Sequence, residues 1–329
     1  MIEWLMEPLQ YGFMTRALLT TLIASVTCAL LSCWLVQIGW SLMGDAVSHS
    51  VLPGVVIAYI LGWPFAVGAF IFGIGAVALI GGIQSTTKIK SDAAIGVVFT
   101  SLFALGVVLI SVTPSQTDLS HILFGNVLGV SVDDLWQVFI IGLLTCVILV
   151  VKRRDFTLLA FDPTHAHAIG INVRLLRALL LGLLALTVVI TLQAVGIILV
   201  VAMLIIPGAT AYLLTASMGR MLVLAAVATS IAALAGVYVS YYADVSTGGA
   251  VVLAQAVLFL AAYVFGPRGG VLPRLTRRRR AARDRIAAAT PAPGPADSAT
   301  PAPGPAESAT LAVPNPDERG RNEAVHTRG

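Results

Sequence analysis

Charged side chains are scarce in this sequence of 329 residues. Only 11% of its residues are Asp, Glu, Lys or Arg, whereas a soluble globular domain averages about 25%. Hydrophobic residues make up 58% of the chain, and its mean hydropathy is +0.93. These values exclude a soluble protein and indicate an integral membrane protein. The formal net charge of +4 reflects basic loops and a basic tail rather than a nucleic-acid surface.

Several signatures of catalysis are also missing from the sequence. There is no G-x-x-x-x-G-K-[ST] phosphate loop, so the chain does not hydrolyse ATP by that means. The absence of H-E-x-x-H argues against one class of intramembrane metalloprotease, and nothing resembles a nucleophile elbow. The chain is therefore not expected to be an enzyme. Any energy source other than an ion gradient must come from another chain.

Cysteine is rare as well. Cys28, Cys33 and Cys146 all lie in apolar segments. We expect them to be small packing residues, not a disulfide framework or a metal site.

Long apolar runs dominate what is present, and a helix needs about 20 apolar residues to cross a bilayer. Nine runs meet this requirement: 16–37, 42–62, 64–86, 92–112, 135–151, 174–194, 196–216, 221–242 and 249–265. The last run is short and the two around Gly196 are hard to separate, so eight spans are the alternative. The sequence thus predicts an all-α, polytopic transmembrane helical bundle with 8–9 spans.

Basic residues predict the orientation of this bundle, because cytoplasmic loops are enriched in Lys and Arg. Every second loop is basic, and the loops between them carry Asp but no Lys or Arg. We therefore expect a multi-pass protein of the cell membrane with a cytoplasmic C-terminus and, for nine spans, an external N-terminus. The uncharged loop at 37–41 stays unassigned. The basic loop and tail residues are Lys88, Lys90, Lys152, Arg153, Arg154, Arg174, Arg177, Arg220, Arg268, Arg274 and Arg277 to Arg280.

The C-terminal part has a different composition. Residues 269–329 begin with a basic stretch and continue with a ten-residue Pro/Ala repeat at 289–298 and 299–308. Such a sequence cannot bury a core. We expect a transmembrane domain over residues 1–268 and a disordered cytoplasmic tail over 269–329.

One stretch of the second run carries candidate chemistry. Between Ala17 and Thr87 the only charged side chain is Asp45 and the only histidine is His49. Four residues apart, they share one face of a helix. A carboxylate in a span costs about 2.5–3.5 kcal/mol on insertion scales, which favours a functional role. Carboxylate and imidazole are ligands for a divalent transition metal.

Three other interpretations of this pair stay open. Asp45 could cap a helix start while His49 packs in the bundle, the two could relay protons in a secondary transporter, or the chain could anchor an extracellular complex. The position of Asp45 is also unusual, since it lies near the end of its run, whereas transport sites are expected near the midplane.

Proline and glycine interrupt two apolar runs. Pro53-Gly54 predicts a kink in the second run. Gly196 and the pair Pro207-Gly208 predict two further breaks. Broken helices can line a pathway, and kinked helix packing is the alternative.

Two polar segments complete the pattern. Asp162 is a good N-cap, Pro163 fits the first helical position and Gly170 suits a helix stop. They predict a helix of about two turns between basic flanks, suited to docking a cytoplasmic partner. In an outward loop, Asp118 and His121 could contact an arriving metal or partner at an outer mouth.

Four segments together resemble the membrane permease of manganese/zinc/iron ABC importers, a family of type II importers. They are Leu42-Met-Gly-Asp-Ala-Val-Ser-His-Ser-Val-Leu-Pro-Gly-Val, the outward segment 118–129, the segment 161–171 and the segment 193–207. The resemblance covers residues 10–268. It implies a permease homodimer, two cytoplasmic ATP-binding subunits and an external metal-binding protein, with a pathway along the dimer axis.

The resemblance also implies roles for particular residues. The proposed metal ligands of the family fall on Asp45 and His49. The coupling helix that docks into the ATPase matches Asp162, Pro163, His165, Ala166, Ala168 and Gly170.

The resemblance identifies the transported ion less directly than it identifies the family. Val-Ser-His-Ser-Val-Leu-Pro-Gly is similar to members assigned to manganese, and no His-rich loop typical of some zinc systems is present. We expect Mn²⁺ as the substrate, with Zn²⁺ or Fe²⁺ as the alternative, and no permanently bound cofactor.

Overall fold

The computed structural model describes residues 7–113, 127–268 and 270–273, and within these ranges it contains helices and no strand. Nine stretches of helix in the described part are long and apolar enough to cross a membrane. The prediction of an all-α bundle with 8–9 spans is confirmed, and the described part of the chain offers nine candidates. The spans are α2 (Gly12–Ile38), α3 with α4 (Met43–Ser50 and Leu52–Leu61), α5 (Phe65–Thr86), α6 (Ser91–Val112), α8 (Val132–Val151), α11 (Val173–Val195), α12 (Ile197–Leu214), α13 (Met218–Ala243) and α14 (Thr247–Phe265).

Four shorter elements connect or precede the spans. They are η1 (Pro8–Gln10), η2 (Val127–Gly129), α9 (Arg153–Phe161) and α10 (Pro163–Ala168). By its internal contacts the chain divides into a unit over Met1–Arg279 and a unit over Arg280–Gly329. The second unit, most of the predicted tail, and the outer-mouth candidates Asp118 and His121 lie outside the described residues.

Helix α2 forms the centre of the first unit. It packs against α8, α12 and α13, and 67% of its most apolar window is buried. A helix that is apolar all round is suited to such a central position. By contrast, only 17% of the equivalent window of α14 and 22% of those of α6 and α8 are buried. These peripheral helices present apolar side chains outward, as a lipid-facing helix does.

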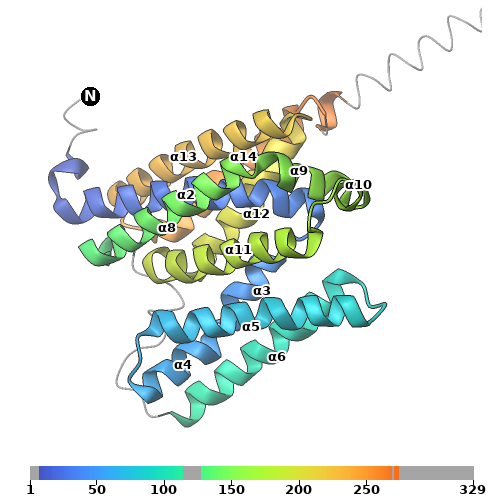
Figure 1. Cartoon of the computed structure of the whole chain (residues 1–329). Helices are drawn as coiled ribbons and strands as arrows, with labels where there is room; N and C mark the ends of the chain where they lie inside the picture. Colours follow the sequence, from blue (N-terminus) through green and yellow to red (C-terminus); the bar gives the residue numbers. More distant parts are fainter. Residues whose placement is uncertain (1–6, 114–126, 269, 274–329) are drawn as a thin grey trace, which may run out of the picture. The chain divides into compact units, whose positions relative to one another are not determined.

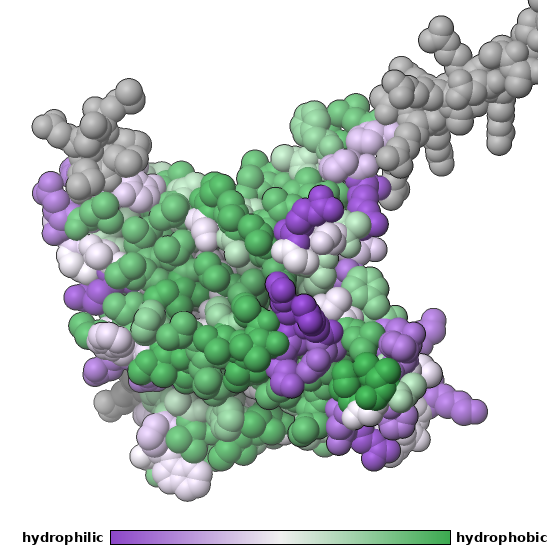
Figure 2. Space-filling model, turned by 45° about the horizontal axis from the view of Figure 1, so that its top comes forward, coloured by the Kyte–Doolittle hydropathy of each residue, from purple (hydrophilic) through white to green (hydrophobic). Residues whose placement is uncertain are grey.

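Figure 2 shows the resulting surface: a broad hydrophobic area, with hydrophilic residues gathered toward its two ends. This distribution fits a bundle whose middle lies in the hydrocarbon core of a bilayer. Cys28 and Cys33 are fully buried in the core of this bundle, in agreement with the packing role expected for them.

Two predicted helix interruptions are confirmed and one is wrong. The second run divides at Val51, and Gly196 (φ 85°) separates α11 from α12. Pro207, however, lies inside the continuous helix α12. The Ser32 hydroxyl of α2 accepts a hydrogen bond from the Gly208 N–H (3.0 Å) and donates one to the Ile205 carbonyl (3.4 Å). A neighbouring helix thus supplies hydrogen-bond partners to the backbone on both sides of Pro207, and the predicted break does not occur.

Gly54 also permits a close helix contact, which the predicted kink did not include. A Cβ atom there would lie 2.7 Å from the carbonyl carbon of Gly68 and 2.9 Å from Cδ2 of Phe72, and closer still to the Gly68 carbonyl oxygen. Gly54 therefore allows α4 and α5 to touch through their backbones. Small residues at such crossings let membrane helices approach closely.

Candidate metal site

The segment that carries Asp45 and His49 begins with a sharp turn after α2. Gly39 adopts a left-handed conformation (φ 82°), and the Trp40 N–H donates to the Leu35 carbonyl at 2.7 Å. The Gly39 N–H donates to the Val36 carbonyl at 3.3 Å, which completes a Schellman ending. Glycine is the residue that adopts this backbone without strain. After this turn the chain needs only a few residues to begin α3 at Met43.

Helix α3 holds the two candidate ligands together, as their spacing predicts. Nε2 of His49 lies 3.3 Å from Oδ1 of Asp45. The Asp45 side chain is 31% exposed and the His49 side chain 25% exposed. The pair is thus accessible from one side while the rest of α3 is largely buried. The part of the chain that the structure describes has no group of three or more His, Cys, Asp or Glu that could hold a metal.

Two aromatic rings of α6 enclose the imidazole, and the sequence interpretation missed them. The ring centroids of Phe99 and Phe103 lie 5.2 Å and 5.3 Å from that of His49, the second in an edge-on arrangement. Nδ1 of His49 is buried and has no hydrogen-bond partner. The rings therefore restrict the imidazole to an orientation in which Nε2 faces Asp45. Two Phe residues four apart in an apolar helix give no signal that separates them from ordinary packing.

The depth of the site differs from what its position in the second run suggests. Figure 1 shows α3 between α11 and α12 on one side and α5 and α6 on the other, and α3 contacts all four. A Cβ on Gly44 would meet Leu204, near the middle of α12. His49 meets Phe99, near the middle of α6. Gly44 and His49 lie on either side of Asp45 in the sequence, so the pair lies near mid-depth of these two helices.

The short helix α10 forms as predicted from its end signals. The Asp162 carboxylate accepts a hydrogen bond from the His165 N–H at 2.8 Å, and Pro163 occupies the first turn. Gly170 is left-handed (φ 88°), and the Ile171 N–H donates to the Ala166 carbonyl at 3.1 Å. Ala166 is buried, whereas His165, His167 and Ala168 are exposed. A groove of about 760 Å³ lies beside α10. Its lining residues are Pro163, Thr164, His167, Gly170, Ile171, Asn172, Val173, Arg174 and Arg177.

Contacts connect the end of α2 to the helix that precedes α10. The Trp34 and Phe156 rings lie 5.8 Å apart, and both side chains are fully buried. Helix α9, which also contacts α10, is therefore packed on the end of α2.

Comparison with known proteins gives a consistent result. A family model described as "ABC 3 transport family" matches residues 10–266. The chain is 49% identical over 277 residues to the manganese transport system membrane protein MntB of Synechocystis, covering 84% of this chain and 90% of that protein. It is 46% identical over 259 residues to the chelated iron transport system membrane protein YfeD of Yersinia pestis, covering 79% and 87% respectively. The solved structure of PsaBC from Streptococcus pneumoniae in complex with Fab is similar, with a TM-score of 0.74, 38% identity, and coverage of 82% of this chain and 98% of that one.

Proposed function

The chain belongs to the ABC 3 transport family and is a membrane permease subunit, and on that premise we propose that it imports a divalent transition metal, with Mn²⁺ as the preferred ion. The preference for manganese is supported by relatives named for manganese transport and by the Val47–Gly54 segment. Relatives named for iron transport make Fe²⁺ the second candidate.

The pairing of Asp45 with His49 at mid-depth is the observation that carries this proposal. A carboxylate oxygen and an imidazole nitrogen 3.3 Å apart can both approach one cation. Two ligands per chain bind weakly, and a site on a transport pathway must release its ion. In a homodimer, two copies facing one another across the axis would offer two carboxylates and two imidazoles.

Energy and delivery come from partners in this proposal. The chain has no phosphate loop, so two cytoplasmic ATP-binding subunits hydrolyse ATP and dock on α10. An external metal-binding protein delivers the ion on the opposite side. The basic loops support a cytoplasmic position for α10 and the C-terminus.

Substitution of each ligand tests the site. Asp45→Ala and His49→Ala should each lower manganese accumulation at least about tenfold, because each removes one of two donors. Asp92→Ala is the matched control, since Asp92 is an exposed carboxylate in the first turn of α6. The readouts are cellular manganese by mass spectrometry and co-purification with the ATPase subunit, which all three variants should retain. Normal accumulation in both ligand variants would refute the site.

A second measurement separates ATP-driven import from a secondary transporter. Inactivating the ATPase partner should abolish uptake in cells that keep their membrane potential. Uptake that persists would indicate coupling to an ion gradient. Inhibition of Mn²⁺ uptake by added Fe²⁺ or Zn²⁺ then ranks the three ions by transport preference.

A further inference from the structure

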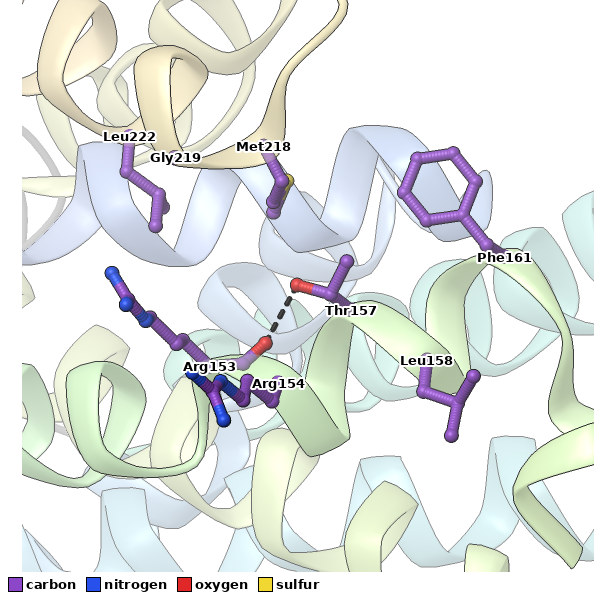
Figure 3. Close-up of a pocket in the computed structure, with 8 residues that line it drawn as sticks. All are labelled: Arg153, Arg154, Thr157, Leu158, Phe161, Met218, Gly219 and Leu222. Carbon is purple, nitrogen blue, oxygen red and sulfur yellow. Dashed lines mark hydrogen bonds between the residues drawn. The ribbon is translucent and has the colours of Figure 1, made fainter.

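A groove of about 590 Å³ lies away from the candidate metal site, between α9 and the beginning of α13. Figure 3 shows side chains from both helices around it. Its lining residues are Arg153, Arg154, Thr157, Leu158 and Phe161 from α9, and Met218, Gly219 and Leu222 from α13.

The groove lies where two membrane-spanning helices, α8 and α13, end or begin. Arg153 follows the last residue of the span α8, Val151, after a single intervening residue. Met218 is the first residue of the span α13. The groove therefore opens at the bilayer surface on the side where the basic loops gather.

One part of the groove is positively charged and uncompensated. Lys152 forms an ion pair with Asp155 at 3.0 Å, whereas neither Arg153 nor Arg154 has an acidic partner among the described residues. Both arginines are exposed. Met218 and Gly219 are the first residues of α13, so the positive end of that helix dipole adds to this charge. Arginine forms paired hydrogen bonds with phosphate oxygens.

The remainder of the groove is apolar. Phe161 is 60% exposed, and Leu158 and Met218 are half-buried. The Thr157 hydroxyl donates to the carbonyl of Arg153 at 2.6 Å, so its hydrogen is already engaged (Figure 3). A ligand that fits the whole groove combines an anionic head with a hydrocarbon chain.

We propose that this groove binds an anionic phospholipid of the cytoplasmic leaflet, with its phosphate on Arg153 and Arg154 and an acyl chain along Leu158, Phe161 and Met218. The inner leaflet supplies such lipids, and each Lys or Arg near its surface strengthens binding roughly fivefold. The groove at α10 involves Arg174 and Arg177 instead and is assigned to the ATPase partner.

Native mass spectrometry of the purified full-length chain with added phosphatidylglycerol tests this proposal. Arg153→Gln with Arg154→Gln should weaken one phosphatidylglycerol site about 25-fold, roughly fivefold for each arginine. Arg174→Gln with Arg177→Gln is the matched control and should bind as the wild type does. Phe161→Ala should also weaken binding, although it keeps both charges. Phosphatidylcholine should not compete, because it lacks net negative charge, and inorganic phosphate should not displace the lipid.

Three results would overturn the proposal. Equal lipid occupancy in the wild type and the Arg153/Arg154 variant would remove the site. Equal losses in both double variants would mean a general effect of charge. If the Arg153/Arg154 variant bound lipid normally but no longer co-purified with the ATPase subunit, the groove would be assigned to a protein partner. Melting temperatures of all variants establish that each is folded. Manganese transport does not enter the test, so its outcome is independent of the proposed function.

Discussion

Replacement of Gly54 by alanine tests whether contact between α4 and α5 holds the candidate metal-binding segment in place. The new Cβ would lie 2.7 Å from the Gly68 carbonyl carbon and 2.9 Å from Cδ2 of Phe72. Ordinary contacts begin at about 3.4 Å, so α4 must move by at least about 0.7 Å. The obstacle includes the backbone of Gly68, which cannot rotate away as a side chain can.

The cost follows from this geometry. Overpacking a close contact costs about 1–3 kcal/mol, and the rigid obstacle favours the upper part of that range. The better helix propensity of alanine returns up to about 1 kcal/mol. A net loss of about 2 kcal/mol corresponds to a melting temperature roughly 4–8 °C lower for a domain of this size.

A thiol-reactive dye provides the assay, because Cys28 and Cys33 are fully buried and react only on unfolding. Gly75→Ala is the matched control on α5: a Cβ there meets nothing within 4 Å. The control should melt at or slightly above the wild-type temperature. Gly54→Ala should also lower manganese uptake although Asp45 and His49 are intact. If both variants melt as the wild type does, or both fall equally, the reasoning is wrong.

Three further predictions concern smaller contacts. Phe99→Leu with Phe103→Leu should weaken the apparent affinity for Mn²⁺ by at least about fivefold, since each ring contact is worth about 0.5–1.5 kcal/mol and the two together about 1–3 kcal/mol. Uptake at saturating Mn²⁺ should stay near the wild-type level, and an unchanged affinity contradicts an orienting role for the rings. Ser32→Ala removes the hydroxyl beside Pro207 and should destabilise the chain by about 1–3 kcal/mol in the same melting assay, whereas Ser85→Ala, which loses an exposed local hydrogen bond, should not. Asp162→Ala removes the N-cap of α10, which should destabilise that helix by about 1 kcal/mol and reduce co-purification of the ATPase subunit. Asp155→Ala is the control, and an equal yield of ATPase subunit from the two variants would contradict a role for the cap in docking.

Much of the fold follows from local rules that the sequence states directly. Long apolar runs predict spans, and the segment from Asp162 to Gly170 predicts α10 because N-cap, proline and glycine act within a few residues. The shared face of Asp45 and His49 is likewise a matter of helical spacing. These features need no knowledge of distant parts of the chain.

What could not be predicted depends on contacts between helices far apart in sequence. Pro207 predicts a break by itself, and only the approach of Ser32 from α2 shows why the helix continues. The mid-depth of Asp45 depends on which residues of α6 and α12 surround α3. The role of Phe99 similarly becomes visible only when α6 packs on α3.

The sharp turn at Gly39 has a consequence for hydration. Helix α3 starts directly after the exposed Leu42, and no side chain caps its N-terminus. The first amides of any helix lack partners within it, and hydrocarbon cannot supply them. The Met43 N–H donates to the Trp40 carbonyl at 2.9 Å, and the next amides of α3 require water or another polar group. If Asp45 binds the transported ion, as we propose, an ion that approaches from this side can keep part of its hydration shell.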